Sequence, residues 1–164
     1  MQNPTYIAIA IVAINLVATI ILTRIEKAPD VTNNAGEITG RKYTRNSFIK
    51  KFNAPMAKRI GRLTFLGCSE LEAIDLLEAL VIDDRAFENC TSLENINLPK
   101  ATRICTNAFM ECENLSVAYI PNATRIGNNA FRGCTALENI ELPRVDYIRR
   151  HTFEGCTALK NINL

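Results

Sequence analysis

Six cysteines and one histidine are the side chains of this 164-residue sequence with the most distinctive chemistry. Thiols can form disulfides, bind metals or act as nucleophiles, and an imidazole can act as a base. Side chains that recur at a fixed spacing beside apolar residues are expected to point into a core, where cysteine serves as a small buried residue. Because there is no CxxC motif and no Cys/His cluster, the spacing favours reduced, buried thiols over disulfides or a metal site. The five cysteines that recur every 22 residues are Cys68, Cys90, Cys112, Cys134 and Cys156.

The remaining two candidates carry weaker signals. Cys105 lies outside the repeated column, at a turn position where Gly61 and Gly127 stand in other units. It is the one thiol expected to react, unless it is simply a replacement of glycine. His151 occupies a turn position with no repeated carboxylate or serine partner, so a solvated surface histidine is expected. The sequence therefore predicts no catalytic residue, no metal ligand and no cofactor, and it gives no indication of an enzyme.

The elements that must position these side chains follow the same period of 22. Isoleucine and leucine columns accompany the cysteines, and six units fill residues 33–164. The first unit is eroded, with Tyr43 in the phenylalanine position and Ile38 in an isoleucine column. A unit of this length cannot cover its own apolar face, so stacking of units into a solenoid is expected. The phenylalanine column consists of Phe65, Phe87, Phe109, Phe131 and Phe153.

Spacing within a unit predicts its local structure. Apolar residues fall three apart from Phe131 to Ile140 and then two apart to Leu142. This change predicts a short helical turn that runs into a strand. Pro143 and its equivalents Pro99 and Pro121 would end that strand. Strands of successive units are expected to stack in parallel as one long sheet on the concave side.

The segments AFRGCTALENIELP and AFENCTSLENINLP resemble leucine-rich repeats of the BspA-like, or Treponema pallidum, type. The resemblance covers about four fifths of the chain and implies an α/β leucine-rich-repeat solenoid with six 22-residue units and a parallel concave sheet. Members of this family are mostly surface-exposed adhesion or recognition proteins, so the resemblance implies binding rather than catalysis. The sequence departs from the pattern in its eroded first unit and at Leu77, where a proline is expected.

Strand positions that flank the buried residues would line the concave face and bind a protein or glycan. Val117 and Tyr119 stand out there as an apolar pair among amides and carboxylates, which is the composition of a hot spot inside a polar rim. The alternative is that Tyr119 leans inward over the small Ala118. The predicted binding residues are Asp75, Asn95, Asn97, Val117, Tyr119, Asn139 and Glu141.

A basic column recurs on another face, with Arg59, Arg103 and Arg125 close to Lys100 and Arg144. Its ordinary interpretation is a solvated strip. The net charge of the chain is only +2, and no aromatic residues are interleaved with these arginines, so no nucleic-acid partner is expected.

The first 23 residues carry no charge, and seventeen residues from Tyr6 to Leu22 are almost wholly apolar. A helix of about 20 residues rises about 30 Å, which matches a bilayer core. We therefore predict a single-pass membrane anchor over 1–23, with residues 4–23 in the membrane, followed by a basic linker over 24–32. A cleaved signal and a buried core helix are the alternatives. Lysine and arginine beyond the span favour a cytoplasmic repeat domain, whereas the resemblance implies the cell surface.

These features together predict a membrane-anchored leucine-rich-repeat protein that binds a protein or glycan. The alternative is a structural accessory subunit of a membrane protein complex. The last unit keeps its apolar columns to Leu164, so this end could dock on a neighbour or on a second copy, or the chain could be a fragment. The identity of the ligand, the membrane topology, cleavage of the first segment and the oligomeric state are left open.

Overall fold

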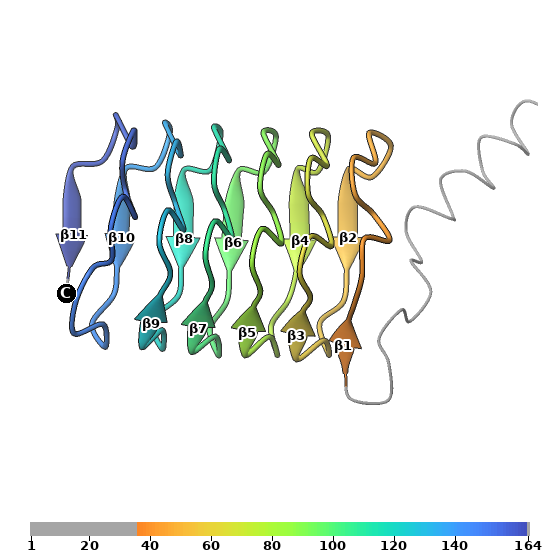
Figure 1. Cartoon of the computed structure of the whole chain (residues 1–164), viewed down its shortest axis with the longest axis horizontal. Helices are drawn as coiled ribbons and strands as arrows, with labels where there is room; N and C mark the ends of the chain where they lie inside the picture. The colour runs from red at the N-terminus through yellow and green to blue at the C-terminus, as the bar shows by residue number, and fades with distance from the viewer. Residues whose placement is uncertain (1–35, 164) are drawn as a thin grey trace, which may run out of the picture.

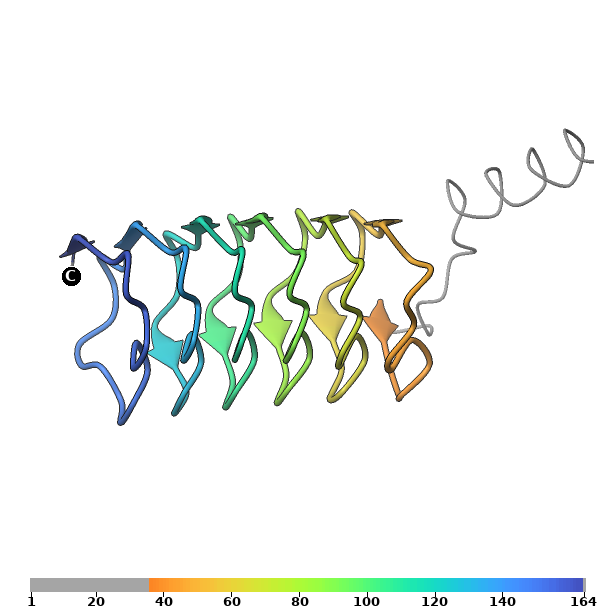
Figure 2. The same cartoon turned by 90° about the horizontal axis from the view of Figure 1, so that it is seen from above.

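The computed structural model describes residues 36–163, which form a rod of stacked coils with a period of 22 residues (Figure 1). Each coil carries a three-residue strand on one side, and most carry a two-residue strand on another (Figure 2). The coils follow one another along a nearly straight axis. The predicted parallel solenoid of about six turns is therefore confirmed.

The three-residue strands are the ones that the sequence predicted. They pair in parallel in register, so that Ile96 of one coil faces Ala118 of the next and then Ile140. They form two ladders rather than one, β2-β4 and β6-β8-β10-β11. These strands are β2 (Lys51–Asn53), β4 (Ala73–Asp75), β6 (Asn95–Asn97), β8 (Val117–Tyr119), β10 (Asn139–Glu141) and β11 (Asn161–Asn163).

A second parallel sheet runs beside the first and was not predicted. Its two-residue strands place an inward isoleucine beside an outward residue, as Ile104 and Arg103 do in the middle of the rod. The ladder ends at β9, because Ile148, which continues the isoleucine column, lies outside any strand. The strands are β1 (Glu37–Ile38), β3 (Arg59–Ile60), β5 (Val81–Ile82), β7 (Arg103–Ile104) and β9 (Arg125–Ile126).

The predicted helical turn is wrong, since residues 36–163 contain no helix. The segment after each phenylalanine forms successive four-residue turns, each closed by a hydrogen bond between residues three apart, such as Cys90 N–H to Phe87 O at 3.1 Å and Leu93 N–H to Cys90 O at 3.1 Å. Left-handed residues interrupt every coil, for example Asn107 at φ 57° and Asn89 at φ 60°. A residue with positive φ cannot continue a right-handed helix. The architecture is therefore a β-solenoid with turns, not an α/β repeat.

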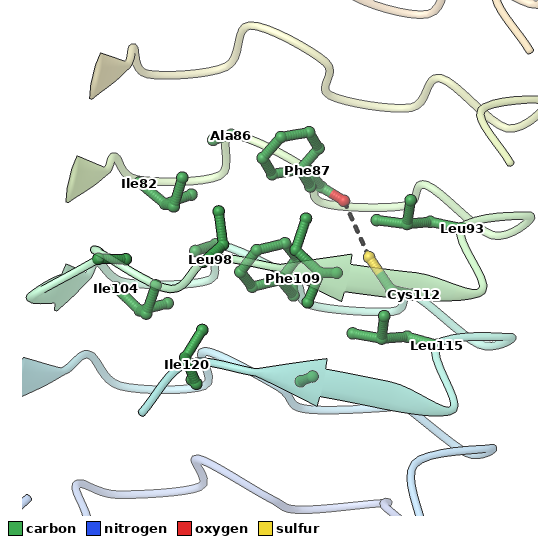
Figure 3. Close-up of a cluster of buried hydrophobic side chains, with 14 of the residues drawn as sticks. Ile82, Ala86, Phe87, Leu93, Leu98, Ile104, Phe109, Cys112, Leu115 and Ile120 are labelled. Carbon is green, nitrogen blue, oxygen red and sulfur yellow. Dashed lines mark hydrogen bonds between the residues drawn. The ribbon is translucent and has the colours of Figure 1, made fainter. Parts of the chain in front are cut away.

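The core is a set of side-chain ladders along the axis of the rod (Figure 3). The ring of Phe87 lies 5.2 Å from that of Phe109, and the two rings are parallel. Phe131 follows at 5.4 Å. Each ring is fully buried, so stacking and burial act together. The stacking of the coils thus determines which residues meet.

The eroded first unit also forms a coil. Tyr43 stacks on Phe65 at 5.2 Å in the phenylalanine ladder, and Ile38 is fully buried against Ile60. Phe52, in place of an isoleucine, contacts both rings edge-on. The sequence alignment of this unit is therefore confirmed in its principal positions.

The predicted membrane anchor over 1–23 and the linker over 24–32 lie outside the described residues. Within 36–163, no helix is present that could cross a bilayer.

Candidate functional site

The repeated cysteines lie in the core, as the sequence predicts. Cys90, Cys112 and Cys134 are fully buried, and all five repeated thiols are free. Each sulfur lies within hydrogen-bonding distance of a carbonyl oxygen in the preceding coil, as in Cys112 Sγ to Phe87 O at 3.1 Å (Figure 3). Burial raises the pKa of the thiols well above the ordinary value. Within residues 36–163 no group of histidine, cysteine and carboxylate side chains could hold a metal ion.

Cys105 is placed less favourably for reaction than the sequence suggests. It is half-buried, and its sulfur faces the carboxylate of Asp83 at 3.9 Å. Burial, together with Asp83 and Asp84, raises the pKa of this thiol to about 11. A thiol that stays protonated at neutral pH is a poor nucleophile. The electrostatic environment therefore disfavours the reactivity that the sequence suggested for Cys105, and that reactivity stays a prediction.

His151 does have a carboxylate partner, which the sequence analysis missed. Its Nδ1 contacts Glu154 Oε2 three residues on, and Glu154 also pairs with Arg132 at 3.2 Å. The imidazole is exposed, and its residue takes a left-handed conformation with φ 56°. Cys156 is the nearest repeated nucleophile in the sequence, but its sulfur faces Phe131 O at 3.0 Å. The described residues assemble no nucleophile-base pair around His151.

The predicted binding residues lie together on the face of the three-residue strands, which we call the strand face. Val117 and Tyr119 are 52% and 51% exposed at the two outward positions of β8, while Ala118 between them is buried. Tyr119 therefore points outward, and the alternative in which it leans inward is wrong. The strand alternation alone accounts for this outward direction.

Polar side chains surround this pair in register. Val117 lies between Asn95 and Asn139, and Tyr119 lies between Asn97 and Glu141. All four neighbours are exposed. Asp75, the remaining predicted residue, lies on β4 in the adjoining ladder and is half-buried. The structure thus brings six of the seven predicted residues together, with Val117 and Tyr119 as an apolar centre and four polar residues around it.

A second candidate lies on the sheet of two-residue strands. An open hollow of about 210 Å³ is lined by Arg103, Arg125 and Arg149, with Gly127 and Asp84 beside them. Arg103 and Arg125 belong to the basic column seen in the sequence, but Arg149 does not. The period of 22 already placed Arg149 one coil beyond Gly127. The sequence could not show that the ladder of two-residue strands ends at β9, or that a hollow lies beside this end.

Comparison with known proteins identifies relatives of the whole repeat region. The profile of the family described as the BspA type leucine rich repeat region matches residues 36–160 in six copies. The chain is also similar to the crystal structure of a Treponema pallidum leucine-rich repeat protein, at 27% identity and a TM-score of 0.71, over 77% of this chain and 62% of that one.

A leucine-rich repeat protein from Bacteroides ovatus shares the fold at 24% identity and a TM-score of 0.58, over 78% of this chain and 40% of that one. The chain thus covers less than two thirds of the length of either solved protein. A comparison with curated proteins finds no match.

Proposed function

This chain belongs to the BspA-type leucine-rich repeat family, whose repeats are generally involved in binding rather than in catalysis. We propose on that basis that the chain binds a protein or glycan ligand on its strand face. The solved relatives are named only as leucine-rich repeat proteins, so the ligand must be argued from the side chains of this chain.

The observation that carries the proposal is the exposed pair of Val117 and Tyr119 on β8. An aromatic ring that is half-exposed at the centre of a rigid sheet offers contact area at little cost in conformational entropy. Amides at Asn95, Asn97 and Asn139 supply donors and acceptors around it. A central apolar anchor within a polar rim is the usual arrangement of a binding hot spot.

Nothing in the packing of the rod accounts for an exposed tyrosine at this position. The equivalent residues Asn97 and Glu141 are polar, and the coils stack in the same register there. Attachment to a membrane through residues 1–23 is part of the same proposal, and it rests on the sequence alone.

The test is to compare the full-length chain with a Tyr119→Ala variant on an oligosaccharide array and against a displayed peptide library. We expect the variant to lose at least about tenfold in affinity for whatever the unaltered chain binds, because a central aromatic anchor is removed. Thermal melting should stay within a few degrees, since the side chain is half-exposed.

Tyr147→Ala is the matched control, since Tyr147 is 60% exposed and lies outside the strand face. It should bind as the unaltered chain does. If Tyr119→Ala binds the same ligands with the same affinity, the strand face is not the binding site.

A further inference from the structure

The basic column is neutralised in the first part of the rod but not farther along. Arg59 donates two hydrogen bonds to Asp83 in the next coil, Nε to Oδ2 and Nη2 to Oδ1, both at 2.8 Å. Such a bidentate pair is the strongest arrangement of a guanidinium with a carboxylate. The fold itself therefore shows where a carboxylate sits against this column of arginines.

The same offset of 24 residues leads to no carboxylate in the later coils. From Arg103 it leads to Gly127, and from Arg125 it leads to Arg149. Within residues 36–163, the guanidinium groups of Arg103 and Arg125 form no hydrogen bond or salt bridge. The position that Asp83 fills for Arg59 is thus left without an acid.

This missing acid coincides with the hollow described above, which we call the arginine hollow. Its lining includes the three guanidinium residues Arg103, Arg125 and Arg149, and the single carboxylate of Asp84. A concave surface with one prevailing charge concentrates the field and attracts the opposite ion. At about 210 Å³ it is smaller than the pockets of about 300–1,000 Å³ that hold drug-sized ligands. A small anion is the class of ligand that fits.

A backbone amide adds a second argument from the repeat. Asp84 accepts a hydrogen bond at Oδ1 from the N–H of Thr106 in the next coil, at 3.0 Å. In the next coil, the position equivalent to Asp84 is occupied by Thr106, which has no carboxylate. The position equivalent to Thr106 is in turn occupied by Asn128. The N–H of Asn128 makes no hydrogen bond in the described part of the chain. The fold thus has a backbone N–H position that donates to a carboxylate, and in the hollow the equivalent N–H has no acceptor within the described residues.

The ladder of two-residue strands ends beside the hollow. The equivalent segment of the next coil, around Ile148, does not form a strand, so β9 is the last of its row (Figure 1). Arg149 follows there, and it is held by Tyr147, with the ring 5.3 Å from the guanidinium carbon and Nη2 donating to the hydroxyl at 2.9 Å. A restrained side chain loses less conformational entropy when it contacts a ligand.

We propose that the arginine hollow is a binding site for a small polycarboxylate anion. Arg103 and Arg125 hold its carboxylates as Arg59 holds Asp83, Arg149 closes the site from the next coil, and the N–H of Asn128 donates to it. The site lies on the sheet of two-residue strands, apart from the strand face, so it goes beyond the proposed function and does not depend on it.

Citrate is the probe, titrated into the full-length chain at constant ionic strength and followed by backbone amide chemical shifts and calorimetry. We expect saturable shifts at Cys105, Gly127 and Asn128. Arg103→Ala and Arg125→Ala should each weaken citrate binding at least about tenfold, because each removes a charge-assisted hydrogen-bond donor. Both side chains are exposed, so these variants should fold.

A variant that keeps every arginine separates a site from general charge attraction. Thr106→Asp places a carboxylate where the preceding coil has Asp84, in an exposed position that the repeat already tolerates. It should abolish citrate binding, whereas Thr106→Ser should retain it. Arg144→Ala, which removes one exposed positive charge from a residue that does not line the hollow, should also retain it.

Citrate shifts that persist unchanged in Thr106→Asp, or that weaken equally in Arg144→Ala and Arg103→Ala, would overturn the site. Sulfate is titrated in parallel under the same conditions. If it binds as tightly as citrate, the assignment to polycarboxylates is wrong. Tyr119→Ala should leave citrate binding unaltered. The experiment therefore distinguishes a failure of this proposal from a failure of the strand-face proposal.

Discussion

A cysteine in the repeated column gives a carbonyl oxygen of the preceding coil a second hydrogen-bond donor as well as filling space. Cys90 and Cys134 repeat the contact of Cys112, with sulfur 3.1 and 3.2 Å from the carbonyl oxygens of Phe65 and Phe109. The same two oxygens also accept backbone hydrogen bonds, from Cys68 N–H at 3.0 Å and Cys112 N–H at 3.3 Å, so the thiol is an additional, weak donor. The column therefore combines the small volume of an apolar side chain with a weak donor, which alanine lacks.

The thiols should react with alkylating reagents only at high pH. Cys105 and Cys156 each have a pKa raised to about 11, by burial first. Since only the thiolate reacts, a thiol with that pKa is about 0.1% ionised at pH 8, against about 25% for an ordinary cysteine. Iodoacetamide labelling followed by mass spectrometry should show slow modification of these two at pH 8 and a rate that rises steadily to pH 10.

Four cysteines, Cys68, Cys90, Cys112 and Cys134, are fully buried and should stay unlabelled throughout. The same chain unfolded in guanidinium chloride should label at all six positions. Modification of Cys105 at pH 8 at the rate seen in the unfolded chain would show that this thiol is not protected as described.

At the scale of the element, the turns decide the shape of each coil. Two left-handed positions recur per coil, one of them at Arg85, Asn107 and Asn129, and the other at Gly67, Asn89 and Glu111. Coil-to-coil hydrogen bonds follow the same period, as in Phe87 N–H to Ala108 O at 2.8 Å. The backbone groups that a helix would pair internally are thus used between coils, which is why turns replace the predicted helical segment.

Gly127 lies where the backbones of adjacent coils approach each other closely. A Cβ built there would lie 2.5 Å from the backbone nitrogen of Thr106, and its φ is not in the left-handed region. Gly127→Ala should therefore destabilise the chain by about 1–3 kcal/mol through overpacking. The measurement is the free energy of unfolding in urea.

Gly40 is the matched control, since it has no atom within 4 Å of a Cβ but takes φ +84°. Gly40→Ala should cost about 1–2 kcal/mol from backbone strain alone, and the cost should not depend on packing against a neighbouring coil. An unchanged stability in Gly127→Ala would mean that the coils can separate there freely.

At the scale of the molecule, the rod is held together by contacts between neighbours only. Ion pairs such as Lys50–Glu72, Lys100–Glu78 and Lys160–Glu138 join residues exactly one period apart, and the strand ladders do the same. Exposed pairs of this kind contribute little individually. Their spacing shows instead that each coil is a structural unit with two neighbours.

Removal of one whole coil should therefore leave a folded, shorter rod. Deletion of residues 88–109 joins Phe87 to Met110 and keeps the register of every remaining column. It also keeps the Arg59–Asp83 pair. Circular dichroism should show a native β spectrum with a lower melting temperature, because fewer coil interfaces remain.

Deletion of 88–98, half a coil, is the control, and it should unfold the rod beyond that point because inward and outward positions no longer match. If the two deletions melt alike, the coils are not independent units. This comparison tests the organisation of the solenoid into coils and does not depend on which ligand the chain binds.

The stacking of the coils was predictable because apolar residues that recur at a fixed period are all buried only when successive units stack in register. Tyr43 could be placed in the phenylalanine ladder from its spacing alone, and the outward direction of Val117 and Tyr119 follows from strand alternation. The sheet of two-residue strands was not predictable, because a strand of this length gives no periodic signal. The partner of His151 was missed because it lies within the same unit and because its column is irregular, with Glu88 the equivalent acid three units earlier but Met110 and Arg132 between them.

The sequence by itself determined the repeat, the core columns and the outward face, since burial of apolar side chains at a fixed period depends only on residue type and spacing. The tertiary structure alone decided how charges meet between coils and where the second ladder ends. Both depend on how one coil is positioned on the next. This positioning places Asp83 beside Arg59, whereas the equivalent residue for Arg103 is Gly127. That positioning is a property of packed backbones and not of any single repeat.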